Sequence, residues 1–377
     1  MLSFNVAKRH DEFAAVADGW NDLVRAMRRP SPYLLHEWLL AWARHYVPQG
    51  NLRVVTAHRG ERLVGGFPLY LVRVRGMRVI RFLGGSQSAL CDLVMRPDGD
   101  EDVQMLLLDA ARQSGHDFAD LFGFPLDGRL SGARELARLE VLERVEAPIL
   151  DLSPGFDSVY AAHTTSKRRN SDRRRAHQLA AAGRIDVAIA RSGADLLTSL
   201  ERACDINRRR WQGRPDGSDF STPRGERFQQ EAAATLAELG VPRIVTLALD
   251  GQTIAFHYSF LLGDRLFVHR LGFDPAFARF GPGWHVMLEA LRLAAEDGAT
   301  LVEYLGGDES YKLELSDRIE PLGEGVGMAR TRRGRAAVPL ILQAIAARKR
   351  LKRSTFARRL YERVAQVRTP GRSNESR

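Results

Sequence analysis

The sequence predicts an α/β fold of the mixed-sheet, α+β kind that occurs twice along the chain. Three observations predict it. With 377 residues, the chain is longer than one ordinary hydrophobic core supports, so two domains are expected. Two stretches that begin at Arg53 and Arg243 share one order of apolar strands and glycine-bearing turns. A helix-period apolar run and a short apolar strand then follow each stretch.

Each repeat begins with three predicted strands separated by two polar turns. The first reads RVVTAHRGERLVGGFPLYLVRVRGMRVIRFLG, and the second reads RIVTLALDGQTIAFHYSFLLGDRLFVHRLG. The turns HRGER, LDGQT, RGM and LGDR contain the Gly and Asp residues typical of tight antiparallel hairpins. Both stretches therefore predict an antiparallel strand triplet.

A helix is predicted after each triplet, over residues 103–115 and 285–298. In the second helix the apolar residues recur at the spacing of one helical face: Met287, Ala290, Leu291, Ala294 and Ala295. Gly115 and Gly298 stand where a helix commonly ends. Short apolar strands are predicted next, at 118–124 and 299–307.

Helical segments also precede each repeat, in WNDLV and HEWLLAWARHY before the first and at 157–182 and 193–211 before the second. We therefore expect an N-terminal domain over 1–150 and a C-terminal domain over 151–330. A basic amphipathic tail, residues 331–377, follows them.

Composition excludes several classes of protein. Cys91 and Cys204 are the only cysteines and lack metal-ligand or disulfide-framework spacing, so neither a metal site nor a disulfide scaffold is expected. The start MLSFNVAKRHDEF lacks a signal-peptide layout, and no window has the apolar length of a membrane span. We expect a cytoplasmic protein.

The net charge of +10 belongs to the tail. Residues 331–377 carry 14 Lys/Arg and 2 Asp/Glu, which leaves 42 basic and 44 acidic side chains in the first 330 residues. The nearly neutral body gives no general nucleic-acid signal. The tail's arginines accompany apolar residues at helical spacing, so it is predicted either to contact an anionic inner-membrane face or to cover the protein's own apolar surface.

Several segments carry a family likeness: SKRRNSDRRRAHQLAAAGRIDV, NRRRW at 207–211, LDGQTIAF at 249–256, GFDPAFARFGPGWHVMLEAL, and EYLGGDESYKLELS at 303–316. In this order they resemble the GNAT acyltransferase fold, and more closely the tandem-GNAT group of CelD/BcsL-type acetyltransferases and FemAB-type peptidoglycan aminoacyl transferases. The first half matches by pattern, through SPYLLHEWLLAW and GERLVGGFPLYL. The resemblance implies two tandem GNAT-like domains.

The resemblance also implies a donor site for acetyl-CoA. In such folds a glycine turn before the main helix holds the pyrophosphate through backbone N–H groups. The corresponding residues here are Arg279, Phe280, Gly281, Gly283 and Trp284. The chain departs from the usual pattern, since Ala278 stands where the family has Arg or Gln, and Pro282 removes one N–H. A loop that merely starts a helix is the alternative.

The first half offers no comparable donor site. Between Gly84 and its helix it reads GSQSALCDLVMRPDGDED, with acidic residues where a phosphate would arrive. We expect this half to shape the acceptor side of the cleft.

Acyl transfer needs a base, polarisation of the carbonyl and stabilisation of the leaving thiolate. Asp308 or Glu309 is a candidate base, Tyr311 a candidate acid, and Lys312 a charge for the carbonyl oxygen; the family likeness favours Asp308 and Lys312. The alternative is a polar turn that caps the next element. His257, with His269, is a further candidate, as is Glu303 as an in-strand base; a structural histidine or surface glutamate is the alternative.

A basic cluster, Lys167–Arg169 and Arg173–Arg175, lacks the interleaved aromatic residues of single-strand binders, so nucleic acid is not an expected partner. It is predicted to be a solvated helix face or to recognise a phosphate-bearing ligand. The resulting hypothesis is an acetyl-CoA-dependent N- or O-acetyltransferase that acts on a polysaccharide or cell-envelope precursor. The alternatives are a FemAB-type transferase that uses aminoacyl-tRNA, or an inactive scaffold.

Overall fold

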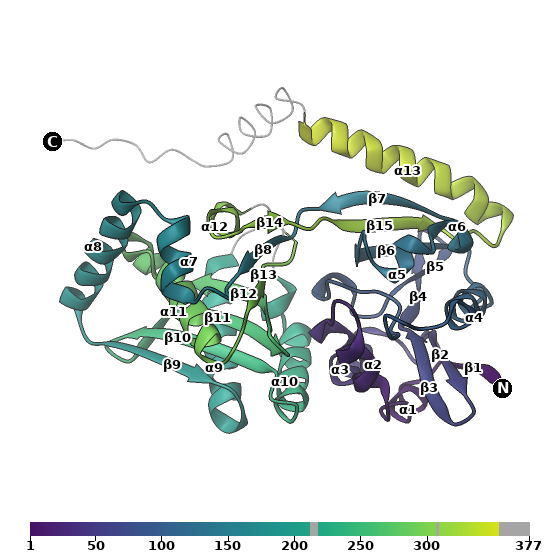
Figure 1. Cartoon of the computed structure of the whole chain (residues 1–377), viewed down its shortest axis with the longest axis horizontal. Helices are drawn as coiled ribbons and strands as arrows, with labels where there is room; N and C mark the ends of the chain where they lie inside the picture. Colours follow the sequence, from purple (N-terminus) through teal and green to yellow (C-terminus); the bar gives the residue numbers. More distant parts are fainter. Residues whose placement is uncertain (212–217, 307–308, 354–377) are drawn as a thin grey trace.

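Three β-sheets organise the chain in the computed structural model, which describes residues 1–211, 218–306 and 309–353 (Figure 1). A three-stranded sheet has the order β1-β2-β3, a five-stranded sheet β4-β5-β6-β15-β7, and a seven-stranded sheet β14-β8-β13-β12-β11-β10-β9. Their strands are β1 (Leu2–Ala7), β2 (Val54–Arg59), β3 (Arg62–Phe67), β4 (Leu69–Val74), β5 (Met77–Phe82), β6 (Phe118–Pro125), β7 (Leu139–Val145), β8 (Pro148–Asp151), β9 (Ile185–Ala190), β10 (Pro242–Leu249), β11 (Gln252–Leu262), β12 (Arg265–Phe273), β13 (Leu301–Glu303), β14 (Arg318–Ile319) and β15 (Leu322–Gly327).

The helices pack on both sides of these sheets, as the mixed-sheet prediction requires. Their bounds are α1 (His10–Ala14), α2 (Trp20–Ala26), α3 (His36–Tyr46), α4 (Glu101–Arg112), α5 (Arg129–Gly132), α6 (Arg134–Ala137), α7 (Phe156–His163), α8 (Ser166–Ala182), α9 (Gly193–Trp211), α10 (Pro223–Ala237), α11 (Pro282–Glu296), α12 (Ser310–Glu314) and α13 (Arg332–Arg353). Among the described strands, β5–β6 and β12–β13 pair in parallel, and the other pairs are antiparallel. The predicted α/β class is confirmed.

The second predicted triplet forms as expected. β10, β11 and β12 are consecutive antiparallel neighbours. Asp250 and Gly251 both have positive φ, 49° and 80°, as a two-residue hairpin turn of the primed type requires. The helix that follows is α11, and four of the five residues predicted on its inner face are buried: Met287, Ala290, Leu291 and Ala294.

The first triplet differs from its prediction, because its middle strand is two strands. Pro68 lies between β3 and β4, where it fixes φ and offers no N–H to a neighbouring strand. β3 pairs with β2 in the three-stranded sheet, whereas β4 pairs with β5 in the five-stranded sheet. The first half therefore has a four-strand sequence divided between two sheets.

The last strand of the second half joins a sheet of the first half. β8 lies in the seven-stranded sheet between β13 and β14. β15 follows β14 in the chain but pairs with β6 and β7 in the five-stranded sheet. The predicted division at residue 150 is untested, but sheet membership does not follow it at β15.

The described part of the tail covers the protein's own apolar surface. Ala337, Val338, Ile341, Leu342 and Ile345 of α13 pack against residues of the five-stranded sheet, which include Val79, Phe118 and Val326. Figure 1 shows α13 running along β7 and β15. Residues 354–377 lie outside the described part of the chain. No helix among the described residues is long and apolar enough to cross a membrane.

Candidate functional site

The candidate site lies where β12 and β13 separate. These strands pair in parallel over three residues only, from Arg265–Leu301 to Phe267–Glu303. β12 then continues to Phe273, while β13 ends. The pairing of β11 with β12 passes from Tyr258–Arg270 to Ser259–Val268, so His269 is an extra residue in a bulge. Bulges of this kind redirect side chains and often lie beside active sites.

A cavity of about 1020 Å³ occupies this separation and extends to the first half of the chain. The second half contributes residues 268–271 of β12, the segment Tyr304–Gly306 and the start of α11. The first half contributes Tyr33, Ser86–Ala89, Phe122, Gly123 and Val145. A volume of this size accommodates a large ligand, and both halves form its wall.

The Gly-Pro-Gly turn starts α11 and lines the cavity. Gly281 is the N-cap with φ 63°, and Pro282 occupies the first helical position, where its missing N–H costs nothing. A Cβ at Gly283 would stand 2.9 Å from Phe273 Cδ1, so the close packing of this turn requires glycine. Both the close packing of the turn and its position beside the cavity thus account for the two glycines.

Fewer backbone donors are available in this turn than the sequence suggests. Gly281 N–H donates to the Ala278 carbonyl (3.0 Å), and Trp284 N–H donates to the Gly281 carbonyl (3.1 Å). Pro282 has no N–H, so within the described residues the Gly283 N–H is the one in this turn that remains for a ligand. The Gly281 amide, predicted to hold phosphate, is already used.

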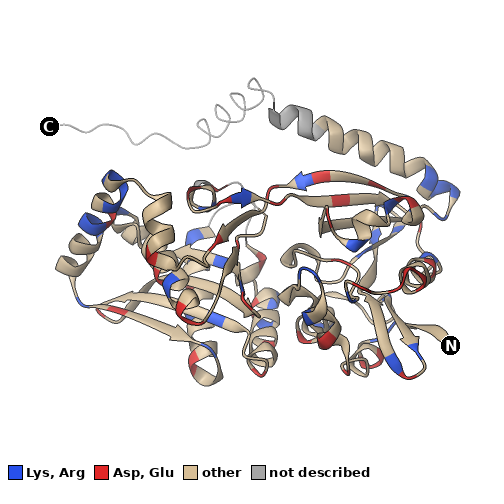
Figure 2. Ribbon diagram, in the orientation of Figure 1, with Lys and Arg blue, Asp and Glu red and all other residues tan. Residues whose placement is uncertain are grey.

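Arginines of α8, rather than Arg279, lie beside this turn. Arg175 Nη1 is 3.3 Å from the position that a Gly281 Cβ would take, and the Arg168 guanidinium lies 4.2 Å from the Trp284 ring centroid. Arg279 is exposed and stacks on Phe280, and neither of them is among the described residues that line the cavity. The basic face predicted on α8, visible in Figure 2, therefore reaches the site through two of its arginines.

The Trp284 side chain is fixed by the same helix. Its Nε1–H donates to Asp172 Oδ2 (3.0 Å), and this carboxylate also accepts from the Tyr160 hydroxyl (2.8 Å). Arg168 forms ion pairs with Asp172 and Glu314, each at 3.3 Å. These contacts hold α8 against the start of α11.

Two of the predicted catalytic residues, Lys312 and Tyr311, line the cavity. Lys312 lies on α12 and is buried; its Nζ donates to the Gly306 carbonyl (3.1 Å) and pairs with the Glu309 carboxylate (2.9 Å). Tyr311 also lines the cavity, and burial raises the pKa of its phenol, which therefore keeps its proton at neutral pH. Asp308 lies outside the described residues.

The two histidine candidates lie in different places. His269 lines the cavity, with Nδ1 3.2 Å from the Tyr33 hydroxyl and Nε2 3.3 Å from the Gln229 amide. His257 is fully buried in the sheet, outside the cavity-lining residues that the structure describes, and neither ring nitrogen has a hydrogen-bond partner there. Burial lowers the pKa of His257 to about 4. The arrangement gives His257 no access to a substrate.

The His257 environment makes a stability prediction. The pKa of this imidazole is lower in the folded state than its unfolded value of 6.5. Above pH 6.5 the imidazole is neutral in both states, so it does not lower the free energy of unfolding. As pH falls from 6.5 toward 4, the unfolded state binds a proton that the folded state does not, and the free energy of unfolding decreases. We expect His257→Leu to remove roughly 3 kcal/mol of acid destabilisation between pH 7.5 and 4. Urea unfolding of wild type and variant across this pH range measures the difference. The other histidines are present in both proteins, so their effects cancel in the comparison. Equal pH slopes for wild type and variant would contradict it.

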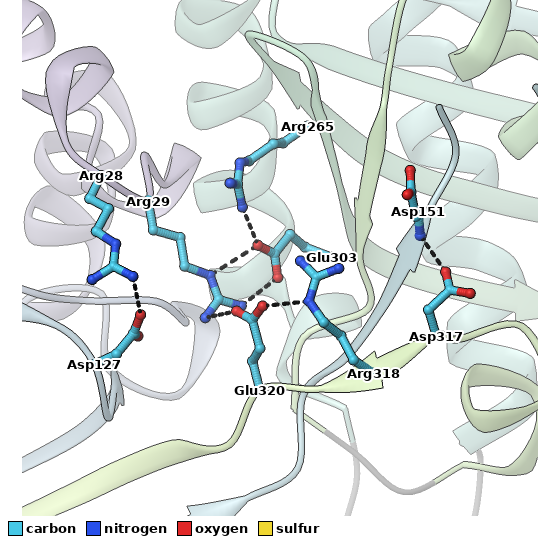
Figure 3. A network of polar contacts seen from close by, with 9 residues as sticks. All are labelled: Arg28, Arg29, Asp127, Asp151, Arg265, Glu303, Asp317, Arg318 and Glu320. Atoms are coloured by element: carbon cyan, nitrogen blue, oxygen red, sulfur yellow. Dashed lines mark hydrogen bonds and ion pairs between the residues drawn. The ribbon is translucent and has the colours of Figure 1, made fainter. Parts of the chain in front are cut away.

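Glu303 is the centre of an ion-pair network and not a surface residue or a free base. Its carboxylate is fully buried and accepts from Arg29 Nε and Nη2 (3.0 and 2.6 Å) and from Arg265 Nη1 (3.0 Å). Arg29 also pairs with Glu320 (2.8 Å), which pairs with Arg318 (2.8 Å; Figure 3). Arg29 follows α2 in the first half, so the network joins the two halves beside the cavity.

Several cavity residues carried no local sequence signal. The Gln87 amide donates to the Asp219 carboxylate (2.6 Å) and the Tyr46 hydroxyl (2.9 Å), and Gln229 donates to Gln87 Oε1 (2.9 Å). These residues belong to segments far apart in the chain. Arg270 is the exception, because a charge inside the apolar strand RLFVHRLGF is a signal that sequence reasoning overlooked.

Comparison with known proteins relates part of this chain to one family. Residues 166–313 match the family model described as an acetyltransferase (GNAT) domain. The sequence matches none of the curated proteins with which it was compared. No group of three or more His, Cys, Asp or Glu side chains suited to a metal occurs among the residues that the structure describes.

Solved structures of low sequence identity share the fold. FemX has a TM-score of 0.57 at 11% identity, over 82% of this chain and 95% of its own. The C-terminal domain of an Agrobacterium fabrum protein described as a lysylphosphatidylglycerol synthetase has a TM-score of 0.56 at 14% identity, over 88% and 96%. A tandem GNAT protein from the clavulanic acid biosynthesis pathway has a TM-score of 0.50 at 11% identity, over 88% and 100%.

These findings confirm the predicted fold of two GNAT-like domains in tandem, and the prediction of an acyltransferase-type enzyme is confirmed at the level of the matched domain. The matched segment contains α8, the Gly-Pro-Gly turn, the separation of β12 from β13, and Lys312. The chain thus contains a GNAT acetyltransferase domain, over residues 166–313, within a tandem-GNAT fold.

Proposed function

We propose that this protein transfers an acyl group, in the simplest case acetyl from acetyl-CoA, to an amine or hydroxyl of a polysaccharide or cell-envelope precursor, as CelD/BcsL-like acetyltransferases do. One observation carries the proposal: the cavity opens where β12 and β13 separate, at the start of α11, within the matched domain. Both halves line it, which leaves room for a donor and an acceptor.

The α11 end of the cavity suits the diphosphate of the donor. The Gly283 N–H points from a helix start, where the dipole favours negative charge. Arg175 is close to Gly281, and it supplies the positive charge that Ala278 does not. Gly283 itself permits the approach, since any larger residue there meets Phe273.

In the proposed reaction the acceptor nitrogen or oxygen attacks the thioester carbonyl, a C–N or C–O bond forms, and the C–S bond breaks. Lys312 supplies positive charge near the carbonyl oxygen, because its ammonium has a third N–H beyond those used by Gly306 and Glu309. Tyr311 holds a proton for the departing thiolate. Asp308 or Glu309 receives the proton of the acceptor; His257 takes no part.

Coenzyme A binding tests the donor site. We expect saturating coenzyme A, at about 100 times its dissociation constant, to stabilise the wild-type protein by ~2.7 kcal/mol in thermal unfolding. Gly283→Ala should weaken binding at least tenfold, since its Cβ meets the Phe273 ring. Gly132→Ala is the matched control, because a Cβ there meets nothing within 4 Å. Wild-type protein that gains no stability from coenzyme A would contradict the donor assignment.

Two alternatives predict other results in the same experiments. A FemAB-type transferase would bind aminoacyl-tRNA with steep salt dependence, which the exposed Arg173 and Arg174 of α8 favour. An inactive scaffold would show neither coenzyme A binding nor release of free thiol with any acceptor. Thiol release with acetyl-CoA and an amine acceptor separates the proposed function from both alternatives, and salt-dependent binding of aminoacyl-tRNA separates the FemAB-type transferase from the scaffold.

A further inference from the structure

Two arginines in the cavity have no carboxylate partner among the residues that the structure describes. Arg210 Nη1 donates to the Leu271 carbonyl (3.3 Å), and Arg270 Nη1 donates to the His269 carbonyl (2.9 Å). Neither forms an ion pair within the described part of the chain, although both line the cavity. The other two cationic side chains there are compensated, since Arg168 pairs with Asp172 and Glu314, and Lys312 pairs with Glu309.

The two unpaired arginines lie toward different ends of the cavity. The Arg210 guanidinium is 5.2 Å from the centroid of Phe273, whose ring lies against Gly283, and so it is on the donor side. Arg270 is 5.9 Å from the centroid of Phe220 and electrostatically close to Tyr33, a residue of the first half. Arg270 therefore lies toward the end of the cavity that the first half closes.

The nearest acid does not neutralise Arg270 by contact. Asp219 attracts Arg270 electrostatically, but the described residues show no ion pair between them. Its Oδ2 accepts from the Tyr46 hydroxyl (2.7 Å) and the Gln87 amide (2.6 Å), and its Oδ1 accepts from Thr222 Oγ1 (3.1 Å). The Asp219 carboxylate is thus committed to a network that joins the halves, and it is held away from Arg270.

A partly buried guanidinium without a counter-charge is costly unless a ligand supplies one. Burial is the largest influence on Arg270 and lowers the pKa of its guanidinium, although the group remains charged at neutral pH. Its flat face lies near the Phe220 ring, and one N–H group is used by the His269 carbonyl, which leaves donors for an incoming anion. Arginine in this position suits a planar carboxylate or a phosphate, to which it can give two parallel hydrogen bonds.

We propose that the acyl acceptor carries an anionic group, a carboxylate or a phosphate, and that Arg270 binds this group at the end of the cavity nearest Tyr33. The identification of the ligand as the acyl acceptor rests on the proposed function, whereas the anion site itself does not. The bulge at His269 gives it a structural basis, because it redirects β12 just before Arg270. An acceptor held there lies across the cavity from the Gly283 turn.

Anion binding by the full-length protein tests the site directly. Isothermal titration with inorganic phosphate and, separately, acetate is carried out at constant ionic strength on wild type, Arg270→Gln, Arg270→Lys and Arg202→Gln. Arg202 is the matched control, an exposed arginine of α9 outside the cavity lining. We expect wild type and Arg202→Gln to bind at least one anion equally. Arg270→Gln should bind it at least tenfold more weakly, with Arg270→Lys between them.

The titrations with phosphate and with acetate, and a competition with coenzyme A, give every outcome a meaning. Tighter phosphate binding identifies a phosphorylated acceptor, and tighter acetate binding a carboxylate-bearing one. Binding that persists in saturating coenzyme A places the anion away from the donor turn, as proposed. The inference is overturned if wild type binds neither anion, if Arg270→Gln binds as wild type does, or if coenzyme A displaces the anion. If coenzyme A itself fails to bind while anion binding depends on Arg270, the proposed function fails and the anion site stands.

Discussion

Replacing Glu303 by alanine is expected to lower the free energy of unfolding by about 3–5 kcal/mol, because the substitution leaves the partly buried Arg265 without a counter-charge. Glu303 is fully buried, and both of its oxygens accept hydrogen bonds from arginine (Figure 3). Arg29 keeps Glu320 as a partner, whereas the only ion pair of Arg265 among the described residues is with Glu303. The loss of Arg265 compensation should dominate the effect.

Chemical denaturation measures the change, with Glu140→Ala as the control. Glu140 is an exposed glutamate of β7 for which the described residues provide no ion pair, and its removal should change stability by no more than about 0.5 kcal/mol. Glu303→Ala and Arg29→Ala should be non-additive when combined, since they share one contact. A Glu303→Ala protein as stable as Glu140→Ala would show that the network does not hold the halves together.

Local signals predicted much of the second half. Asp250–Gly251 fixes a hairpin within two residues, and the helical spacing from Met287 to Ala294 describes one buried face. Such features depend on neighbours in the chain, so composition and periodicity reveal them. In the first half the same reasoning placed a strand through Pro68, where the chain instead changes sheets. The strand pattern was correct there, but its continuity was not.

The features that could not be predicted depend on contacts between distant segments. β15 pairs with β6 across some two hundred residues of chain, and neither strand's pattern specifies its neighbour. The place of Arg175 at the Gly281 turn follows from how α8 packs, and a helix with arginines at several neighbouring positions does not specify which of them reaches the turn. Arg279 shows the same limit, because its guanidinium stacks on Phe280 and it is not among the described residues that line the cavity. Sequence spacing thus identified the turn but not the charges around it.

Replacing Lys312 by alanine is expected to lower kcat for acyl transfer about 10²–10³-fold, the usual cost of removing one donor aimed at a developing oxyanion. The Lys312 ammonium is buried in the cavity wall and fixed by Gly306 and Glu309, so it is preorganised and does not need to move during the reaction. Lys312→Arg keeps the charge but changes its reach, and should retain part of the activity. Lys8→Ala, at the far end of the first half, is the matched control.

A purely structural role for Lys312 would give a different pattern. Lys312 also ties Gly306 to α12, so its loss could displace that wall and weaken coenzyme A binding without affecting the chemical step. Measuring kcat, KM and the coenzyme A dissociation constant for each variant separates the two roles. A catalytic role predicts a large fall in kcat at nearly constant donor affinity, because the interaction forms with the carbonyl oxygen only as its charge develops. Unchanged kcat with weakened donor binding would leave Lys312 as a positioning residue and shift the search for the carbonyl's partner to Arg168 and the other cations of the cavity.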